Sequence, residues 1–347
     1  MTTTVHTEDR PRQRALDRAA GVWSATSRYA AVLLLLIVLF VVFAVTQENF
    51  FTHSNVENLL TSVSILWVVS IAMTFVVLTA GIDLSVGSLL ALSGIILSHL
   101  LNTGMPAWLA VALTLVAGGL IGGGVNGVLI GRVGLSFFVV TLGTLSLYEG
   151  IVNIWSDTKT VYITSSLIDG IGFGKALGIA TPIWIMIGTF LLAFVVLRWT
   201  YFGRDVYAVG GNIDAARLSG INVAWTLIAV YAIAGLGAAL GGVIQAGRLG
   251  AASPLVGADI PLAAAAAVLL GGTSFTGGVG SVVGTAVGVL FIGTLQNGLS
   301  IAGVSSFWQQ VVTGIILILA VAIDRLQQNS RGGFIRRTEP EPVKEPD

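Results

Sequence analysis

A single acidic residue lies inside the most apolar part of the sequence. Asp83 separates two long apolar runs and is flanked by small residues, Gly81, Ser85 and Gly87. A charged side chain at membrane depth is costly, so it usually faces a protein interior or a water-filled path. Irregular backbone, which these small residues permit, is tolerated in a bilayer only where it is buried in protein or lines a cavity. The stretch predicts a polytopic membrane protein with an internal polar site, most simply a transporter.

No set of residues in the sequence has the composition of an active site or a metal site. The chain has no cysteine, and its three histidines, His6, His53 and His99, are widely spaced, so a thiolate or histidine metal cluster is not expected. No acid–base pair or nucleophile stands out, so we predict no catalytic residue and no enzyme activity. The glycine-rich run 271–278 has no lysine and is predicted to be a tight hairpin, because a phosphate-binding loop needs G-x-x-x-x-G-K-[ST].

The composition places the chain among membrane proteins. It is 55% hydrophobic and only 10% charged, and 44 of its 347 residues are glycine. Repeated long apolar stretches of this kind indicate transmembrane helices. The formal net charge is zero, which gives no overall positive field for nucleic acid, so no nucleic-acid partner is expected.

Ten apolar segments follow one another, and we predict an all-α fold of about ten transmembrane helices. The third, eighth and tenth segments are shorter than the roughly 20 residues that a span requires. Short or broken helices often mark the binding region of a transporter. The segments are 29–46, 59–79, 84–101, 107–130, 136–154, 182–199, 223–246, 260–275, 280–298 and 307–323.

The basic residues predict the orientation. With ten spans both ends of the chain share one side, and only Lys159, Lys175 and Arg248 of the 17 lysines and arginines fall on the other. Positive charge collects on the cytoplasmic side of membrane proteins. Both tails, 1–28 and 325–347, are therefore predicted to be cytoplasmic, and the charged, proline-containing C-terminal tail is predicted to be disordered.

Two repeated features suggest how the helices pack. Gly81-Ile82-Asp83-Leu84 and Gly257-Ala258-Asp259-Ile260 each precede an apolar run and would have opposite orientations, as in an inverted repeat, although chance similarity between glycine-rich segments is an equal alternative. Glycines also recur every fourth residue in two segments, which favours close helix packing over a sliding surface. These glycines are Gly119, Gly123, Gly127 and Gly131, and Gly280, Gly284 and Gly288.

The predicted cytoplasmic loop 203–222 contains a short helix with a cap at each end. Asn212 is a plausible N-cap, residues 214–218 form the helix, and Gly220 ends it. A helix this short buries little apolar area, so it is either a docking element for a partner or a loop helix on the membrane surface. The residues predicted to dock are Gly211, Asn212, Asp214, Ala215, Ala216, Arg217, Leu218 and Gly220.

Four stretches of the sequence resemble the ribose-type permease subunits of bacterial ATP-binding cassette (ABC) importers, and the resemblance as a whole covers residues 29–324. Two departures are Ile213, where that loop often has a polar residue, and the arginine-rich N-terminus. The stretches are G-I-D-L-S-V-G-S-L-L-A-L-S-G at 81–94, Y-A-V-G-G-N-I-D-A-A-R-L-S-G-I-N-V at 207–223, L-L-G-G-T-S-F-T-G-G-V-G-S at 269–281 and G-T-L-Q-N-G-L at 293–299.

The resemblance implies a homodimeric ten-helix subunit in the bacterial inner membrane. It implies a cytoplasmic ATPase that docks at loop 203–222, and a soluble external protein that delivers a monosaccharide. ATP and Mg²⁺ would then act through the partner, and this chain would bind no cofactor.

A sugar path needs several weak polar contacts and aromatic faces. The candidate path residues are Asp83, Ser85, Asn126, Phe137, Phe138, Thr141 and Glu149. Asp83 and Asp259 could instead be structural caps that accept hydrogen bonds from the first N–H groups of a helix, and we favour that role for both. Glu149 is also expected near the outer end of its helix, where it could reach the interface.

Three classes of function remain open from the sequence. The first is the ABC permease, for a monosaccharide or, as the runner-up, for a branched-chain amino acid. An ion-coupled secondary transporter would also use inverted repeats, with Asp83 and Asp259 holding the coupling ion. A regulatory or scaffold membrane protein would need no polar interior residues.

Overall fold

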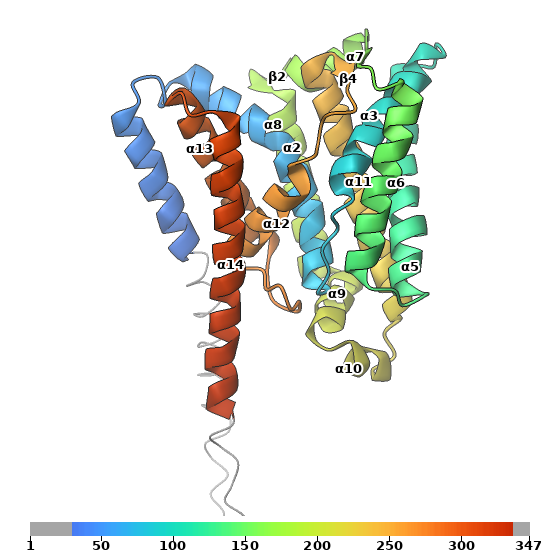
Figure 1. The fold of residues 1–347 in the computed structure, drawn as a ribbon, viewed down its shortest axis with the longest axis vertical. Coiled ribbons are helices and arrows are strands. Elements are labelled where there is room, and N and C mark those ends of the chain that lie inside the picture. Colours follow the sequence, from blue (N-terminus) through green and yellow to red (C-terminus); the bar gives the residue numbers. More distant parts are fainter. Residues whose placement is uncertain (1–29, 336–347) are drawn as a thin grey trace, which may run out of the picture.

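The computed structural model describes residues 30–335, so the predictions for the tails 1–28 and 336–347 lie outside the described residues. The described chain is almost entirely helical (Figure 1). The helices are Ala30–Thr46, α2 (His53–Leu78), α3 (Val86–Asn102), α4 (Ala107–Ile121), the π-helix η1 (Gly122–Gly127), α5 (Val128–Gly131), α6 (Phe137–Ser156), α7 (Ser166–Phe173), α8 (Thr181–Trp199), α9 (Tyr201–Gly211), α10 (Ile213–Leu218), α11 (Val223–Leu249), α12 (Ile260–Leu270), α13 (Val282–Ile301) and α14 (Ser306–Ile335).

Each of the ten predicted apolar segments contains a helix. Within residues 30–335, seven helices are long and apolar enough to cross a membrane, while Ala30–Thr46, α3 and α12 are shorter. The third and eighth segments are short, as predicted. The tenth is not, because α14 continues through polar residues to Ile335 after its apolar run ends. The helix therefore extends past residue 324, where the membrane domain was predicted to end.

Helices α2 and α11 form the centre of the bundle. Every residue of α2 from Val63 to Leu78 is buried, and α11 packs against α2, α3, α4 and η1. The α11 sequence is rich in glycine and alanine, which lets neighbouring backbones approach closely. Helices α4, α6, α8 and α14 surround this centre, and most of their residues are only partly buried or exposed.

The predicted glycine ridge in α4, η1 and α5 lies against α11. A Cβ atom added at Gly123 would lie 2.9 Å from the Cβ of Ala232, and one added at Gly127 would lie 2.7 Å from the Cα of Ile228. These distances are shorter than any normal contact of a methyl group. The ridge is therefore a tight packing surface, as the sequence favoured.

The molecule has two distinct ends (Figure 1). The α10 end carries α9, α10, the start of helix Ala30–Thr46 and the last turns of α14. The α7 end carries α7 and four two-residue strands, which the sequence analysis did not predict. The antiparallel strand pairs are β1 (Val161–Tyr162) with β4 (Ala251–Ala252), and β2 (Lys175–Ala176) with β3 (Ile179–Ala180).

The two segments of the suggested repeat each lead into a short helix. Helix α3 runs toward the α7 end, whereas α12 runs toward the α10 end (Figure 1). The segments also meet, since a Cβ atom added at Gly87 would overlap the carbonyl oxygen of Gly257. Opposite directions and a shared contact support the inverted arrangement over chance similarity.

Candidate functional site

The turn between α2 and α3 encloses Asp83 completely. Its Oδ1 atom accepts hydrogen bonds from the backbone N of Ser85 at 2.9 Å and from the Ser85 hydroxyl at 2.6 Å. Ser85 is the N-cap of α3, so Asp83 satisfies the N–H at the start of that helix from a position two residues earlier. This geometry is the structural role that the sequence favoured for Asp83.

Asn126 joins this turn to the π-helix η1. Its Nδ2 atom donates to the Ser85 hydroxyl at 2.8 Å and, more weakly, to Oδ2 of Asp83 at 3.3 Å. All three side chains are fully buried, as is Thr141 of α6. The structure thus brings together three of the predicted path residues, but in a closed polar cluster rather than on an open surface.

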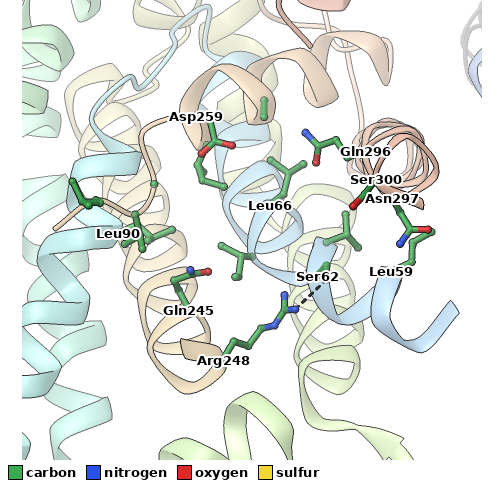
Figure 2. A pocket seen from close by; sticks show the side chains of 18 residues that line it. Leu59, Ser62, Leu66, Leu90, Gln245, Arg248, Asp259, Gln296, Asn297 and Ser300 are labelled. Atoms are coloured by element: carbon green, nitrogen blue, oxygen red, sulfur yellow. Dashed lines mark hydrogen bonds between the residues drawn. The ribbon is translucent and has the colours of Figure 1, made fainter. Parts of the chain in front are cut away.

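Asp259 does not cap α12, so that prediction is wrong. It occupies the N-cap position with φ −88° and ψ −18°, and its side chain accepts no capping hydrogen bond. An N-cap residue normally has extended backbone, which directs its side chain back to the first N–H groups. In the helical conformation found here, the exposed carboxylate instead lines a cavity (Figure 2).

The cavity that contains Asp259, called the large cavity below, has a volume of about 490 Å³. It is built from the first half of α2, the end of α11, the segment before α12 and the second half of α13. Leu59, Leu66 and Leu90 supply part of its apolar wall (Figure 2). Its polar lining consists of Ser62, Gln245, Arg248, Asp259, Gln296, Asn297 and Ser300.

The sequence analysis did not name most of this polar lining. The adjacent amides of Gln296 and Asn297 interrupt an apolar segment and were a usable signal. Arg248 was assigned to an external loop, whereas it belongs to the last turn of α11. Its guanidinium donates to the carbonyl oxygen of Thr61 at 2.8 Å and to the hydroxyl of Ser62 at 3.0 Å.

A second, smaller cavity of about 130 Å³ lies between α3, α6 and the segment before α12. Glu149 of α6 lines it, together with Ser88 and Pro254. Val256 and Gly257 line both the small and the large cavity, so the segment between β4 and α12 separates the two.

The other predicted path residues on α6 differ in exposure. Phe138 is 55% exposed, Phe137 is half-buried and Glu149 is exposed. Gly143 and Gly150 are on the exposed surface too, since no other atom lies within 4 Å of a Cβ atom added at either position. Helix α6 therefore presents an uncovered surface with small residues and a carboxylate.

At the α10 end, the predicted cap of the short helix is confirmed. The Asn212 side chain accepts hydrogen bonds from the backbone N of Asp214 at 3.0 Å and of Ala215 at 2.9 Å. Gly220 follows the helix with a φ of +84°, the left-handed conformation that commonly ends helices. Helix α10 directs Leu218, which is 90% exposed, and Arg217 outward.

Helix α9, which the sequence analysis missed, connects α10 to the bundle. A Cβ atom added at Gly210 would overlap the carbonyl oxygen of Leu78 and lie 2.6 Å from the backbone N of Gly278. The N of Gly278 in turn donates to the carbonyl oxygen of Leu78 at 2.9 Å, and the Tyr207 hydroxyl donates to the carbonyl oxygen of Gly280 at 2.9 Å. Three chain segments therefore meet in backbone contact at this junction, and the run 271–278 is part of the turn between α12 and α13, as predicted.

Comparison with known proteins gives consistent results. Residues 55–321 match the family model described as "Branched-chain amino acid transport system / permease component". The ribose import permease protein of Escherichia coli is 42% identical over 300 residues, which cover 85% of this chain and 93% of the relative. The D-allose transport system permease protein of the same species is 39% identical, covering 86% and 92%. The L-arabinose ABC transporter permease protein of Azospirillum brasilense is 37% identical, covering 90% and 91%.

No solved structure was found to match the chain. The family model nevertheless covers most of the sequence, and the relatives align over nearly their whole length. The predicted resemblance to ribose-type permeases is confirmed, and the chain belongs to the family of branched-chain amino acid transport system permease components.

Proposed function

We propose that this chain is the transmembrane permease subunit of an ABC importer that carries a monosaccharide. The observation that carries the proposal is the set of relatives named for ribose, D-allose and L-arabinose transport, which are 37–42% identical over nearly their whole lengths. Several different monosaccharides recur among these names, so the class of sugar is better supported than any one sugar.

The α10 end is the cytoplasmic end in this proposal. Arg132, which follows α5, lies at that end with Arg198 of α8 and Arg204 of α9, which fits the excess of basic residues on the cytoplasmic side of membrane proteins. The helix Ala30–Thr46 begins at that end and α14 ends there, so both termini would be cytoplasmic.

A separate ATPase would dock on α10 and supply the energy. Helix α10 exposes the ion pair of Arg217 with Asp214 and a large apolar side chain at Leu218, which is the kind of surface that a protein partner covers. Motion imposed on α10 would pass through α9 to the junction with Leu78 and Gly278. ATP and Mg²⁺ would bind to the partner, and this subunit would catalyse no covalent step.

The exposed surface of α6 would face a second copy of the chain. Small residues such as Gly143 and Gly150 allow close helix approach, and a carboxylate such as Glu149 is costly to expose to lipid. Phe138 and Glu149 would then line a path between the two copies. An external sugar-binding protein would deliver its ligand at the α7 end.

One observation favours a second candidate, the branched-chain amino acid permease. The large cavity contains both a guanidinium, Arg248, and a carboxylate, Asp259, and such a pair suits a zwitterion. The names of the relatives weigh against it, since those described above are named for sugars.

The test of the proposal is to extract the tagged chain from its native membrane and identify stoichiometric partners. We expect an ATPase that contains a phosphate-binding loop, and its loss from the complex when Leu218 is changed to Asp. Recovery of the chain without an ATPase from membranes that support ATP-dependent sugar uptake would contradict the proposal.

A further inference from the structure

The polar groups of the large cavity divide into those with partners in the chain and those without. Asn297 is paired, because its amide exchanges hydrogen bonds with Asn55 at 3.0 and 3.1 Å. Arg248 uses its contacts with Thr61 and Ser62 to hold its guanidinium in place, and a guanidinium has five N–H donors, so others stay available.

Three other polar side chains of the cavity have no such partners. The carboxylate of Asp259 and the amides of Gln245 and Gln296 have no hydrogen-bond partner among the described residues. They converge on the cavity from three different elements (Figure 2). Polar side chains within the membrane-spanning part of a protein are costly and usually functional, so their convergence on one cavity without internal partners indicates a ligand.

The position of the cavity fits a ligand that enters from the α7 end. Arg248 and Ser300 belong to the last turns of α11 and α13, while Leu90 and Asp259 lie at the starts of the short helices α3 and α12. The volume of about 490 Å³ falls within the range of roughly 300–1,000 Å³ that is typical of small-molecule sites.

The chemistry of the lining fits a neutral polyol. One guanidinium and one carboxylate leave no excess charge, while the amides can both donate and accept hydrogen bonds. The hydroxyl groups of a sugar need that mixture, and its C–H groups can pack on Leu59, Leu66 and Leu90.

We propose that the large cavity is a binding station for the transported monosaccharide within a single permease chain. Asp259 and Gln296 bind sugar hydroxyls, and Arg248, fixed by Thr61 and Ser62, donates a further hydrogen bond. This inference rests on the proposed function, and it adds a site inside each chain to the path between two chains. The segment between β4 and α12 forms the wall that the sugar must pass to reach Glu149.

The test measures sugar binding to the full chain in lipid nanodiscs, without its partners. Saturation-transfer NMR with D-ribose, D-allose and L-arabinose identifies the sugar that binds and gives its half-saturation concentration. For that sugar we expect Asp259→Asn and Gln296→Ala to raise the half-saturation concentration about tenfold, the factor that corresponds to roughly 1.4 kcal/mol. The control is Asp157→Asn, which makes the same chemical change at an exposed position on the α7 end and should leave binding unchanged.

ATP-driven uptake by the complete importer is measured in parallel. The inference is overturned if the unmodified importer takes up a sugar that does not bind to the chain alone, or whose binding neither variant weakens. Either result leaves the proposed function intact. Binding of L-leucine to the chain alone, abolished by Asp259→Asn, with no binding of any of the three sugars, overturns it in favour of a zwitterion site. No ATP-driven uptake of any of the three sugars by the unmodified importer contradicts the proposed function itself.

Discussion

The junction between α9 and the bundle gives the sharpest test of how motion would enter this permease. Gly210 has no room for a side chain, because an added Cβ atom would overlap the carbonyl oxygen of Leu78 and approach the N of Gly278 to 2.6 Å. Gly211, the next residue, has open space within 4 Å. Gly210→Ala and Gly211→Ala therefore make the same chemical change at adjacent positions with opposite steric consequences.

The size of the expected effect follows from these contacts. Inserting a methyl group into a filled site costs typically 1–3 kcal/mol, and backbone neighbours can yield less than side chains. Alanine also gains roughly 0.5–1 kcal/mol over glycine within a helix, so we expect Gly210→Ala to destabilise the protein by about 1–2 kcal/mol. Gly211→Ala should change the stability by no more than about 0.5 kcal/mol.

Two measurements check this prediction. The apparent melting temperature of the detergent-purified protein should fall for Gly210→Ala and stay near the original for Gly211→Ala. Uptake per assembled importer should also fall for Gly210→Ala, because the displaced α9 would no longer transmit motion to α2. Equal melting temperatures for the two variants, with full uptake for Gly210→Ala, would refute the steric reasoning.

Three further substitutions test other parts of the account. Asn126→Ala removes the amide that donates to Ser85 and Asp83, and we expect a loss of about 1–3 kcal/mol in stability; an unchanged melting temperature would show that the buried cluster is not structural. Arg217→Glu reverses an exposed charge on α10, so it should reduce ATP-driven uptake at least tenfold at an unchanged level of protein in the membrane; normal uptake would argue against docking there. Lys175→Ala breaks an ion pair with Glu57 in which the lysine is 54% exposed, so it should lower the free energy of unfolding by no more than about 1 kcal/mol. A larger loss of thermal stability would show that this ion pair is more important for stability than its exposure implies.

The sequence was sufficient for features that depend on local patterns. Long apolar runs located the helices because each span must satisfy its own backbone hydrogen bonds in lipid. The cap at Asn212 could be predicted because an asparagine directly before a short helix is a local signal. The buried turn at Asp83 was predicted for the same reason, from a lone charge within an apolar stretch.

Features that depend on backbone angles or on contacts between distant residues could not be predicted from the sequence. Asp259 resembles Asp83 in its flanking residues, but only the backbone conformation decides that its carboxylate faces a cavity and caps no helix. The polar lining comes from elements separated by up to about 240 residues, such as Ser62 and Ser300, and no pattern in one segment indicates that they converge. Helix α9 was missed because it is short and contains three glycines, which disfavour a helix.

The central claim is that the chain imports a monosaccharide by the action of a partner ATPase. The most direct measurement is uptake of radiolabelled D-ribose, D-allose and L-arabinose into liposomes that contain the chain, its co-purified ATPase and the sugar-binding protein. We predict uptake of at least one of these sugars that requires ATP inside the vesicles and persists when ion gradients are collapsed. Uptake by the chain alone that is driven by an ion gradient and indifferent to ATP would contradict the account.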